Sequence, residues 1–326
     1  MLVATALLII GLVLLVYGAD RLVFSAAILC RSVGIPPLII GMTVVGIGTS
    51  LPELIVSFSA ASHGQMDIAV GTAMGSNITN ILLILGGAAL LHPLSVHSNL
   101  VRRELPLMLL VTLLCGVTLF DNELSRNDGL ALIAIAALYL WFIIKIARRA
   151  ERDNNDSLTR EQLAELPRDE VGNTVAFLWL AVALIVLPMS TRMVIDNATV
   201  IADYFGVSEL VIGLTIISVG TSLPELATVI AGALKGEDDI AIGNLIGSNI
   251  YNTAIVLGLP ALIHPGTLDP AIFARDYWVM LGVSAVFTLI CLQRSRRIGR
   301  LAGALLLCGF IVWVGMLYGF PSVTFW

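Results

Sequence analysis

Two glutamates occupy the same place in two copies of one motif, and few other charges lie near them. Glu53 ends the sequence GTSLPE, and Glu225 ends an identical GTSLPE 172 positions later. A charged side chain at the centre of a bilayer costs about 2.5–3.5 kcal/mol on insertion scales, so an intramembrane carboxylate indicates function. Two carboxylates that converge in a low-dielectric site must be compensated by positive charge. The pair therefore predicts a cation site.

Neutral oxygen donors accompany both glutamates at helical spacing. Residues four apart lie on the same face of a helix, and a second motif, GSNIxN, follows each GTSLPE. We therefore expect ligands from four such pairs: Thr49 with Glu53, Thr221 with Glu225, Ser76 with Asn80, and Ser248 with Asn252. The neighbouring Asn77 and Asn249 are expected to form hydrogen bonds between helices instead.

A proline precedes each glutamate, at Pro52 and Pro224. Proline lacks an N–H and crowds the carbonyl four residues earlier. We expect the helix to be interrupted around 46–49 and 218–221, which would release main-chain carbonyls as further ligands. Such an interruption at membrane depth is tolerated only where it lines a cavity or is buried in protein.

The donors are carboxylates, hydroxyls, amides and carbonyls. This hard-oxygen set suits Ca²⁺, Mg²⁺, Mn²⁺ or Na⁺ and disfavours zinc and copper. The two carboxylates balance one divalent ion or two sodium ions. The four cysteines are scattered singly and are interpreted as small apolar residues.

The composition indicates where such a site would lie. The chain has 326 residues, of which 58% are hydrophobic and 13% charged, with a mean hydropathy of +0.95. Soluble domains carry about 25% charged residues, so water-soluble enzymes and secreted domains are excluded. The net charge of −5 does not favour a nucleic-acid partner. The sequence predicts a polytopic membrane protein.

Apolar runs predict an all-α fold of ten transmembrane helices. They lie near 2–19, 37–62, 67–91, 104–120, 127–147, 172–191, 208–233, 238–263, 274–293 and 300–319. A polar linker at 148–171 separates a first five-helix repeat, 1–147, from a second, 172–326. With the N-terminus outside, 15 of the 18 Lys and Arg fall in cytoplasmic connectors, and Arg275 is one of three outside. The positive-inside rule then places both termini outside the cell's inner membrane and the linker in the cytoplasm.

The two motif copies belong to a longer internal repeat. Residues 34–93 align without a gap to residues 206–265, with 29 of 60 positions identical. Because five predicted spans separate the copies, the two must cross the membrane in opposite directions. Inverted repeats of this kind are typical of secondary transporters, which bind substrate near the midplane and expose the site alternately to either side.

The paired motifs GMTVVGIGTSLPE with GSNITN and GLTIISVGTSLPE with GSNIYN resemble those of the sodium/calcium exchanger family, within the calcium/cation antiporter superfamily. The resemblance covers essentially the whole chain, which looks like a bacterial member. It implies ten helices in two inverted halves around four cation sites, with Glu53 and Glu225 as ligands shared by calcium and sodium. It adds oxygens from Ser50 and Ser222 and the main-chain carbonyls of Gly46 and Ser218. Asn252 stands where well-studied members usually have Asp, so the site lacks a possible negative charge.

We therefore expect a secondary active antiporter in which Na⁺ drives Ca²⁺ through one shared site. It needs no cofactor, and its partners are the lipid bilayer and the two ions, with no obligatory protein partner. Proton coupling through the same glutamates, and Mn²⁺ in place of Ca²⁺, stay open as alternatives. A channel or a scaffold would lack counter-ion coupling. An intramembrane enzyme with a carboxylate dyad is possible in principle, but the inverted repeat argues against it.

Overall fold

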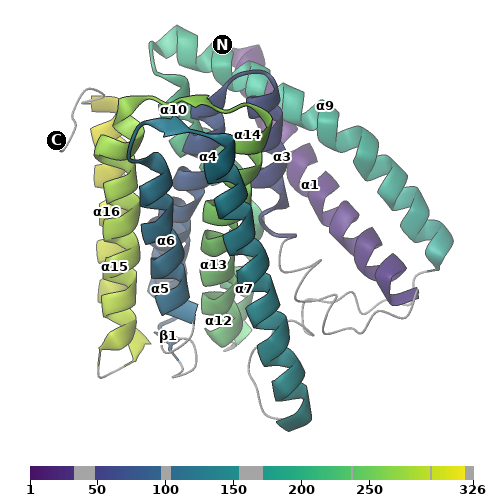
Figure 1. Cartoon of the computed structure of the whole chain (residues 1–326), viewed down its shortest axis with the longest axis vertical. Coiled ribbons are helices and arrows are strands. Elements are labelled where there is room, and N and C mark those ends of the chain that lie inside the picture. The colour runs from purple at the N-terminus through teal and green to yellow at the C-terminus, as the bar shows by residue number, and fades with distance from the viewer. Residues whose placement is uncertain (33–47, 97–103, 154–171, 236–237, 294–295, 320–326) are drawn as a thin grey trace.

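The computed structural model describes residues 1–32, 48–96, 104–153, 172–235, 238–293 and 296–319. Helix dominates these ranges (Figure 1). In the first half the elements are α1 (Leu2–Ser32), α3 (Leu51–Ser62), α4 (Met66–Thr79), the π-helix η2 (Asn80–Leu85), α5 (Gly86–Leu91), β1 (Leu94–Ser95), α6 (Leu105–Leu119), β2 (Glu123–Leu124) and α7 (Arg126–Asp153).

The second half repeats this pattern. Its elements are α9 (Asn173–Phe205), α10 (Glu209–Ile212), the π-helix η4 (Gly213–Ile217), α11 (Ser218–Thr221), α12 (Leu223–Lys235), α13 (Asp238–Tyr251), the π-helix η5 (Asn252–Val256), α14 (Gly258–Ile263), β3 (Gly266–Thr267), the π-helix η6 (Ile272–Tyr277), α15 (Trp278–Leu292), β4 (Arg297–Ile298) and α16 (Arg300–Gly319).

Helical segments lie in every predicted span, although the start of the second span, 37–47, lies outside the described residues. Within the described part of the chain, six segments are long and apolar enough to cross a membrane, and a seventh is added if α10–α11 and α12 form one bent span. The all-helical membrane fold is confirmed. The number ten stays a prediction, because segments such as α3 and α6 are shorter than a full span by these criteria.

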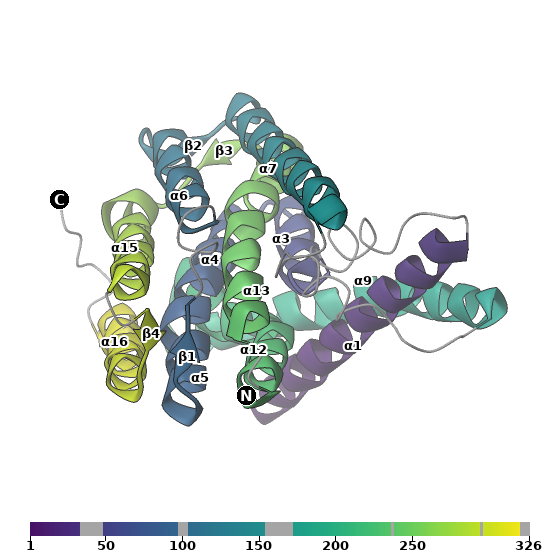
Figure 2. The same ribbon diagram turned by 90° about the horizontal axis from the view of Figure 1, so that it is seen from below.

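The most polar helices are the most deeply buried. In the span Met66–Leu91, 94% of the apolar window is buried inside the protein, whereas in Arg300–Gly319 only 22% is. Figures 1 and 2 place α4 and α13 in the middle of the bundle, with α1, α9, α15 and α16 outside them. Large apolar side chains such as Leu301 face outward. The apolar outer helices therefore shield the motif-bearing helices from lipid.

Small residues allow the central helices to touch backbone to backbone. A Cβ added to Gly71 of α4 would lie 2.7 Å from the carbonyl oxygen of Leu210, and one added to Gly75 would collide with the backbone of Leu214. Gly213 presents the reverse contact, 2.9 Å from the Ile68 carbonyl. Gly71 and Gly75, spaced as Gly-x-x-x-Gly, therefore permit close helix packing, whereas a Cβ added to Gly247 of α13 would meet no described atom within 4 Å.

Two short antiparallel strand pairs join the halves. β1 pairs with β4 and β2 pairs with β3. β1 precedes α6 and β2 follows it, so the pairs lie at opposite ends of α6. The neighbouring α15 runs from β3 to β4, in the direction opposite to α6. A shift of 172 residues maps α6 onto α15 to within one residue, so these two corresponding helices are antiparallel.

Candidate cation site

Glu53 lies in the first turn of α3 and is fully buried, with 0% of its surface exposed. Its Oε1 accepts hydrogen bonds from Ser222 Oγ at 2.8 Å and from Ser76 Oγ at 3.4 Å. Its Oε2 has no hydrogen-bond partner among the described residues. One carboxylate oxygen is therefore anchored by a hydroxyl from α4 and one from the turn between α11 and α12, and the other is left for a ligand.

Glu225 repeats this arrangement in the first turn of α12, also with 0% exposed. Its Oε1 accepts from Ser50 Oγ at 3.4 Å, and its Oε2 finds no partner in the part of the chain that the structure describes. The serine of each GTSLPE motif thus donates to the glutamate of the other half. Because both glutamates begin helices, the positive ends of two helix dipoles help to hold their negative charge.

Neutral oxygens surround the carboxylates. Thr49 Oγ1 lies 3.3 Å from Ser248 Oγ, which connects the first GTSLPE motif to α13. Asn80 donates through Nδ2 to Asn249 Oδ1 at 3.0 Å, and its own Oδ1 is buried without a partner among described residues. Asn252 has no partner there for either side-chain atom. These unpaired amide oxygens are available to a cation.

The helical pairing of each threonine with its glutamate is wrong. Thr49 lies in the turn 48–50, before α3 begins at Leu51, so it does not share a helical face with Glu53. Its hydroxyl faces Ser248 of α13. Thr221 ends α11 and Glu225 lies in α12, and these segments are bent by 44° relative to each other. The prolines separate the members of each pair.

The break in the second half lies one residue later than predicted. Residues 218–221 are helical, and the Ser218 carbonyl accepts from the Ser222 N–H at 3.1 Å and from Thr221 Oγ1 at 3.3 Å. Release of the Ser218 carbonyl by an unwound segment is therefore wrong for this structure. The turn falls at Ser222, because Pro224 has no N–H to donate to the Gly220 carbonyl. The corresponding Gly46 carbonyl lies outside the described residues.

Residue types and their spacing do not predict the π-helices. η2 begins at Asn80 and η5 at Asn252, the same place in both halves. In η5 the Leu257 N–H donates to the Asn252 carbonyl five residues back, at 3.1 Å. π-turns inside α-helices occur frequently at functional sites. Hydropathy and motif spacing carry no signal for this widening, although its repetition in register marks both asparagines.

Asn77 and Asn249, next to Ser76 and Ser248, form hydrogen bonds between helices, as predicted. Asn77 Nδ2 donates to Thr253 Oγ1 at 2.7 Å, and Asn249 accepts from Asn80. These bonds link α4 and η2 to α13 and η5. They hold the two central helices in register around the glutamates.

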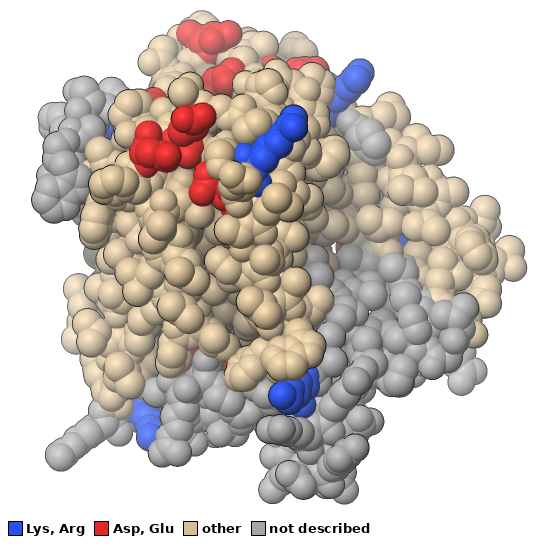
Figure 3. Space-filling model, in the orientation of Figure 1, with Lys and Arg blue, Asp and Glu red and all other residues tan. Residues whose placement is uncertain are grey.

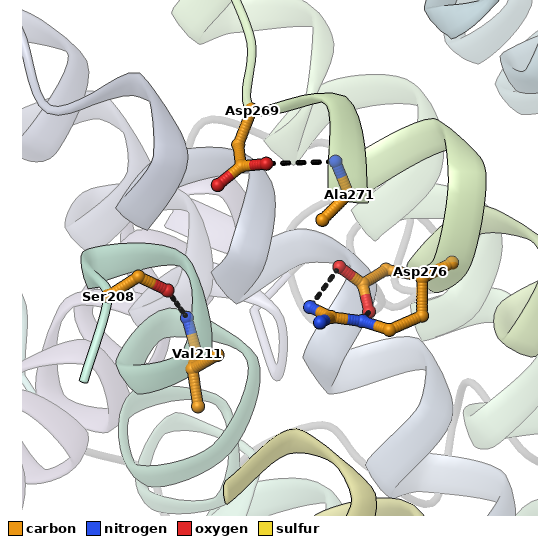
Figure 4. Close-up of polar contacts among 6 residues, drawn as sticks. Ser208, Val211, Asp269, Ala271 and Asp276 are labelled. Atoms are coloured by element: carbon orange, nitrogen blue, oxygen red, sulfur yellow. Dashed lines mark hydrogen bonds and ion pairs between the residues drawn. The ribbon is translucent and has the colours of Figure 1, made fainter. Parts of the chain in front are cut away.

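A second buried charge pair lies away from these motifs. Arg275, predicted in an outer connector, is 1% exposed within η6, and its Nε donates to Asp276 Oδ1 at 2.8 Å. Figure 4 shows the Asp276 ion pair near Ser208, which caps α10, and Asp269, which accepts from the Ala271 N–H at 2.8 Å. Because its carboxylate is neutralised locally, Asp276 differs from the two motif glutamates.

The site can therefore bind a hard cation. Among the described residues no group of three His, Cys, Asp or Glu is placed to hold a metal ion. Neutral oxygens must then complete a shell begun by two carboxylates, which is the coordination that Ca²⁺ accepts and that zinc does not favour. Access to such a buried site from water requires the protein to change conformation.

The helical membrane fold carries two buried carboxylates that have no counter-charge among the described residues, an arrangement suited to binding a cation. The sequence profile of the family described as "Sodium/calcium exchanger protein" matches residues 3–145 and 175–319. The chain belongs to the sodium/calcium exchanger family of membrane cation antiporters.

Individual relatives agree with this assignment. The chain is 66% identical to inner membrane protein YrbG of Escherichia coli K12, covering 98% of both chains. It is 29% identical to the sodium/calcium exchanger MaX1 of Methanosarcina acetivorans, covering 96% of this chain and 97% of the relative. The solved structure of the sodium-calcium exchanger NCX_Mj superimposes with a TM-score of 0.62 at 28% identity, covering 96% and 98% of the two chains.

Proposed function

We propose that this protein exchanges Na⁺ for Ca²⁺ across the inner membrane at one shared site built around Glu53 and Glu225. One observation carries the proposal. Each glutamate is fully buried, uses one oxygen to accept from a serine of the opposite half, and leaves the other without a partner among the described residues. A buried carboxylate without a counter-charge is costly, so the site favours a bound cation.

The charge of the site suggests how the two flows are coupled. The motif residues around the two glutamates are neutral serines, threonines and asparagines, including Asn252. One Ca²⁺ or two Na⁺ balance the two carboxylates, and both ions accept oxygen ligands. Two carboxylates cannot balance the charge of one Ca²⁺ and two Na⁺ at the same time. Binding of one kind of ion therefore requires release of the other.

Alternating access is supported by the relation between the halves. α6 and α15 correspond in the repeat and run antiparallel, and the strand pairs β1–β4 and β2–β3 lie at opposite ends of α6. This is the arrangement that an inverted pair of five-helix repeats, 1–147 and 172–326, would produce. Two such repeats allow two conformations related by a pseudo-twofold rotation, one open to each side of the membrane.

The charge distribution supports the orientation. Figure 3 shows uncharged side chains across the middle of the visible face and charged ones toward its two ends. Fifteen of the 18 Lys and Arg fall in connectors assigned to the cytoplasm. Burial of Arg275 within η6 removes one of the three that were assigned to the outside, which strengthens the bias. We propose ten spans, with both termini periplasmic and the linker 148–171 cytoplasmic.

Flux measurements test the ions directly. Purified protein in proteoliposomes loaded with Na⁺, K⁺ or choline is given external ⁴⁵Ca²⁺, with and without a pH gradient. The proposal requires uptake that depends on internal Na⁺ and is lost in the Glu53→Gln variant. Equal uptake into choline-loaded vesicles without a pH gradient would contradict it and would indicate a channel.

Proton-coupled Ca²⁺ or Mn²⁺ antiport is the second candidate. One observation favours it. Among the described motif residues, Glu53 and Glu225 are the only ionisable groups, and each can bind a proton in place of Na⁺. Uptake driven by a pH gradient in the absence of Na⁺ would support this candidate. Uptake of ⁵⁴Mn²⁺ but not ⁴⁵Ca²⁺ would change the assigned ion and keep the site.

A further inference from the structure

An asparagine outside the two ligand motifs contacts the site from one half only. Asn244 of α13 is 8% exposed and lies one helical turn before Ser248, on the same face of the helix. Its Oδ1 accepts a hydrogen bond from Thr49 Oγ1 at 3.4 Å. Its Nδ2 is buried and has no partner among the described residues. Asn244 therefore extends the polar face that Ser248 and Asn252 present.

The repeat shows that this contact is not symmetric. The position 172 residues earlier is Thr72 of α4, whose Oγ1 donates to the Ile68 carbonyl of its own helix at 2.7 Å. The counterpart of Thr49 is Thr221, which donates to the Ser218 carbonyl of its own segment at 3.3 Å. Thr221 contacts Glu53 of the other half, but Thr72 and Thr221 form no hydrogen bond with each other, so the bond between Asn244 and Thr49 has no counterpart in the repeat.

The bond from Thr49 to Asn244 can orient the Thr49 hydroxyl toward a cation. A hydroxyl that coordinates a cation must point its lone pairs at the ion and its proton elsewhere, and a hydrogen-bond acceptor outside the coordination shell fixes that orientation. Asn244 Oδ1 is such an acceptor for Thr49. Thr49 sits in the turn 48–50 rather than in a helix, so its orientation depends on the opposite half of the protein.

We propose that Asn244 is a positioning residue that sets cation affinity through Thr49 and makes the two halves of the site unequal. The proposal rests on the proposed function, because it assumes that Thr49 faces the transported ion. Asn244 lies at the middle of α13, one turn nearer than Ser248 to Asp238, where α13 begins after the cytoplasmic connector of the proposed topology.

The test compares substitutions at the two equivalent positions. Asn244→Leu keeps the size of the side chain and removes the acceptor, Asn244→Asp keeps the acceptor, and Thr72→Val is the matched control in the other half. KM and Vmax for ⁴⁵Ca²⁺ uptake are measured in Na⁺-loaded proteoliposomes, and ⁴⁵Ca²⁺ binding is measured on the same proteins in lipid nanodiscs. Thermal unfolding of each variant checks its fold.

We expect Asn244→Leu to raise the KM and the Kd for calcium by about 10- to 100-fold, the usual cost of losing an outer-shell partner, with Vmax within about twofold. Asn244→Asp restores the KM to the wild-type value or below. Thr72→Val stays within about twofold of wild type, because its hydroxyl bonds only its own helix. Asn244→Thr, which adopts the residue of the other half, is expected to match Asn244→Leu and serves if the leucine variant does not fold.

Three results would overturn the inference: a KM for Asn244→Leu or Asn244→Thr equal to that of Thr72→Val, a fall in Vmax alone, or failure of Asn244→Asp to restore affinity. Failure of the proposed function looks different. In that case wild-type protein shows no Na⁺-dependent uptake, and calcium binding in nanodiscs still compares Asn244 with Thr72.

Discussion

Replacing Glu53 with glutamine separates the charge of the site from its hydrogen bonds. Glu53 Oε1 accepts from Ser222 at 2.8 Å and from Ser76 at 3.4 Å, and a glutamine Oε1 at the same place accepts both. The amide nitrogen replaces Oε2, which has no partner among the described residues. The substitution therefore removes one negative charge and points a donor at the ion, with the anchoring bonds unchanged.

The expected magnitude follows from the complete burial of Glu53. Removing one partner of a buried ionic interaction costs about 3–5 kcal/mol. At about 1.4 kcal/mol per tenfold, calcium affinity falls by roughly two to four orders of magnitude. The calcium-free variant should unfold at the same temperature as wild type or higher, because one buried charge is gone while a neutral hydrogen bond of about 1 kcal/mol is kept.

The assay combines ⁴⁵Ca²⁺ uptake into Na⁺-loaded proteoliposomes with thermal unfolding in the presence and absence of calcium. Calcium stabilises a protein that binds it, so wild type should unfold at a higher temperature in calcium and Glu53→Gln should not. Glu123→Gln, the same change on an exposed strand residue, is the control and should behave as wild type. Uptake by Glu53→Gln within about threefold of wild type would refute the assignment of Glu53 as a ligand.

Three further predictions concern packing, charge and the helix break. Gly75→Ala should lower the free energy of unfolding by about 1–3 kcal/mol, because the added methyl group collides with the Leu214 backbone. Gly87→Ala, where no described atom lies within 4 Å, is the control and should change thermal stability little. Equal losses of stability in the two variants would contradict the close contact. Asn252→Asp adds a third carboxylate at a position where neither amide atom has a partner among the described residues. Calcium affinity should rise by about tenfold or more, worth about 1.4 kcal/mol, and the calcium-free protein should lose stability. Unchanged ⁴⁵Ca²⁺ binding would place Asn252 outside the site. Pro224→Ala restores a backbone donor at the 44° bend and should lower ⁴⁵Ca²⁺ uptake at least about tenfold, since ligands must be held within about 0.5 Å; normal uptake would show that the proline is dispensable.

Part of the site could be predicted from residue types alone. A carboxylate repeated in register inside apolar sequence is expensive in lipid whatever the fold, so Glu53 and Glu225 stand out without coordinates. The small residues Gly71 and Gly75 and the bonding asparagines Asn77 and Asn249 follow from the same reasoning, because only such residues suit a close helix contact within a membrane.

Other features depend on contacts that residue spacing does not encode. Residues four apart share a face only while the helix continues, and the breaks near Pro52 and Pro224 separate each threonine from its glutamate. Asn244 lies outside the motifs, and its importance is visible only because Thr49 of the other half reaches it. The π-helices depend on how the central helices pack, which local propensity does not specify.

By itself the sequence determined that the protein lies in a lipid bilayer, that it contains an internal repeat, and that its ligand atoms are oxygens. Hydropathy, a constant offset of 172 residues and paired oxygen-bearing motifs are properties of the chain read one segment at a time. Only the tertiary structure decided which donors meet: Ser222 with Glu53, and Ser50 with Glu225. The physical reason is that these bonds join residues about 170 positions apart, and the direction of a side chain across such a distance is fixed by the packing of whole helices.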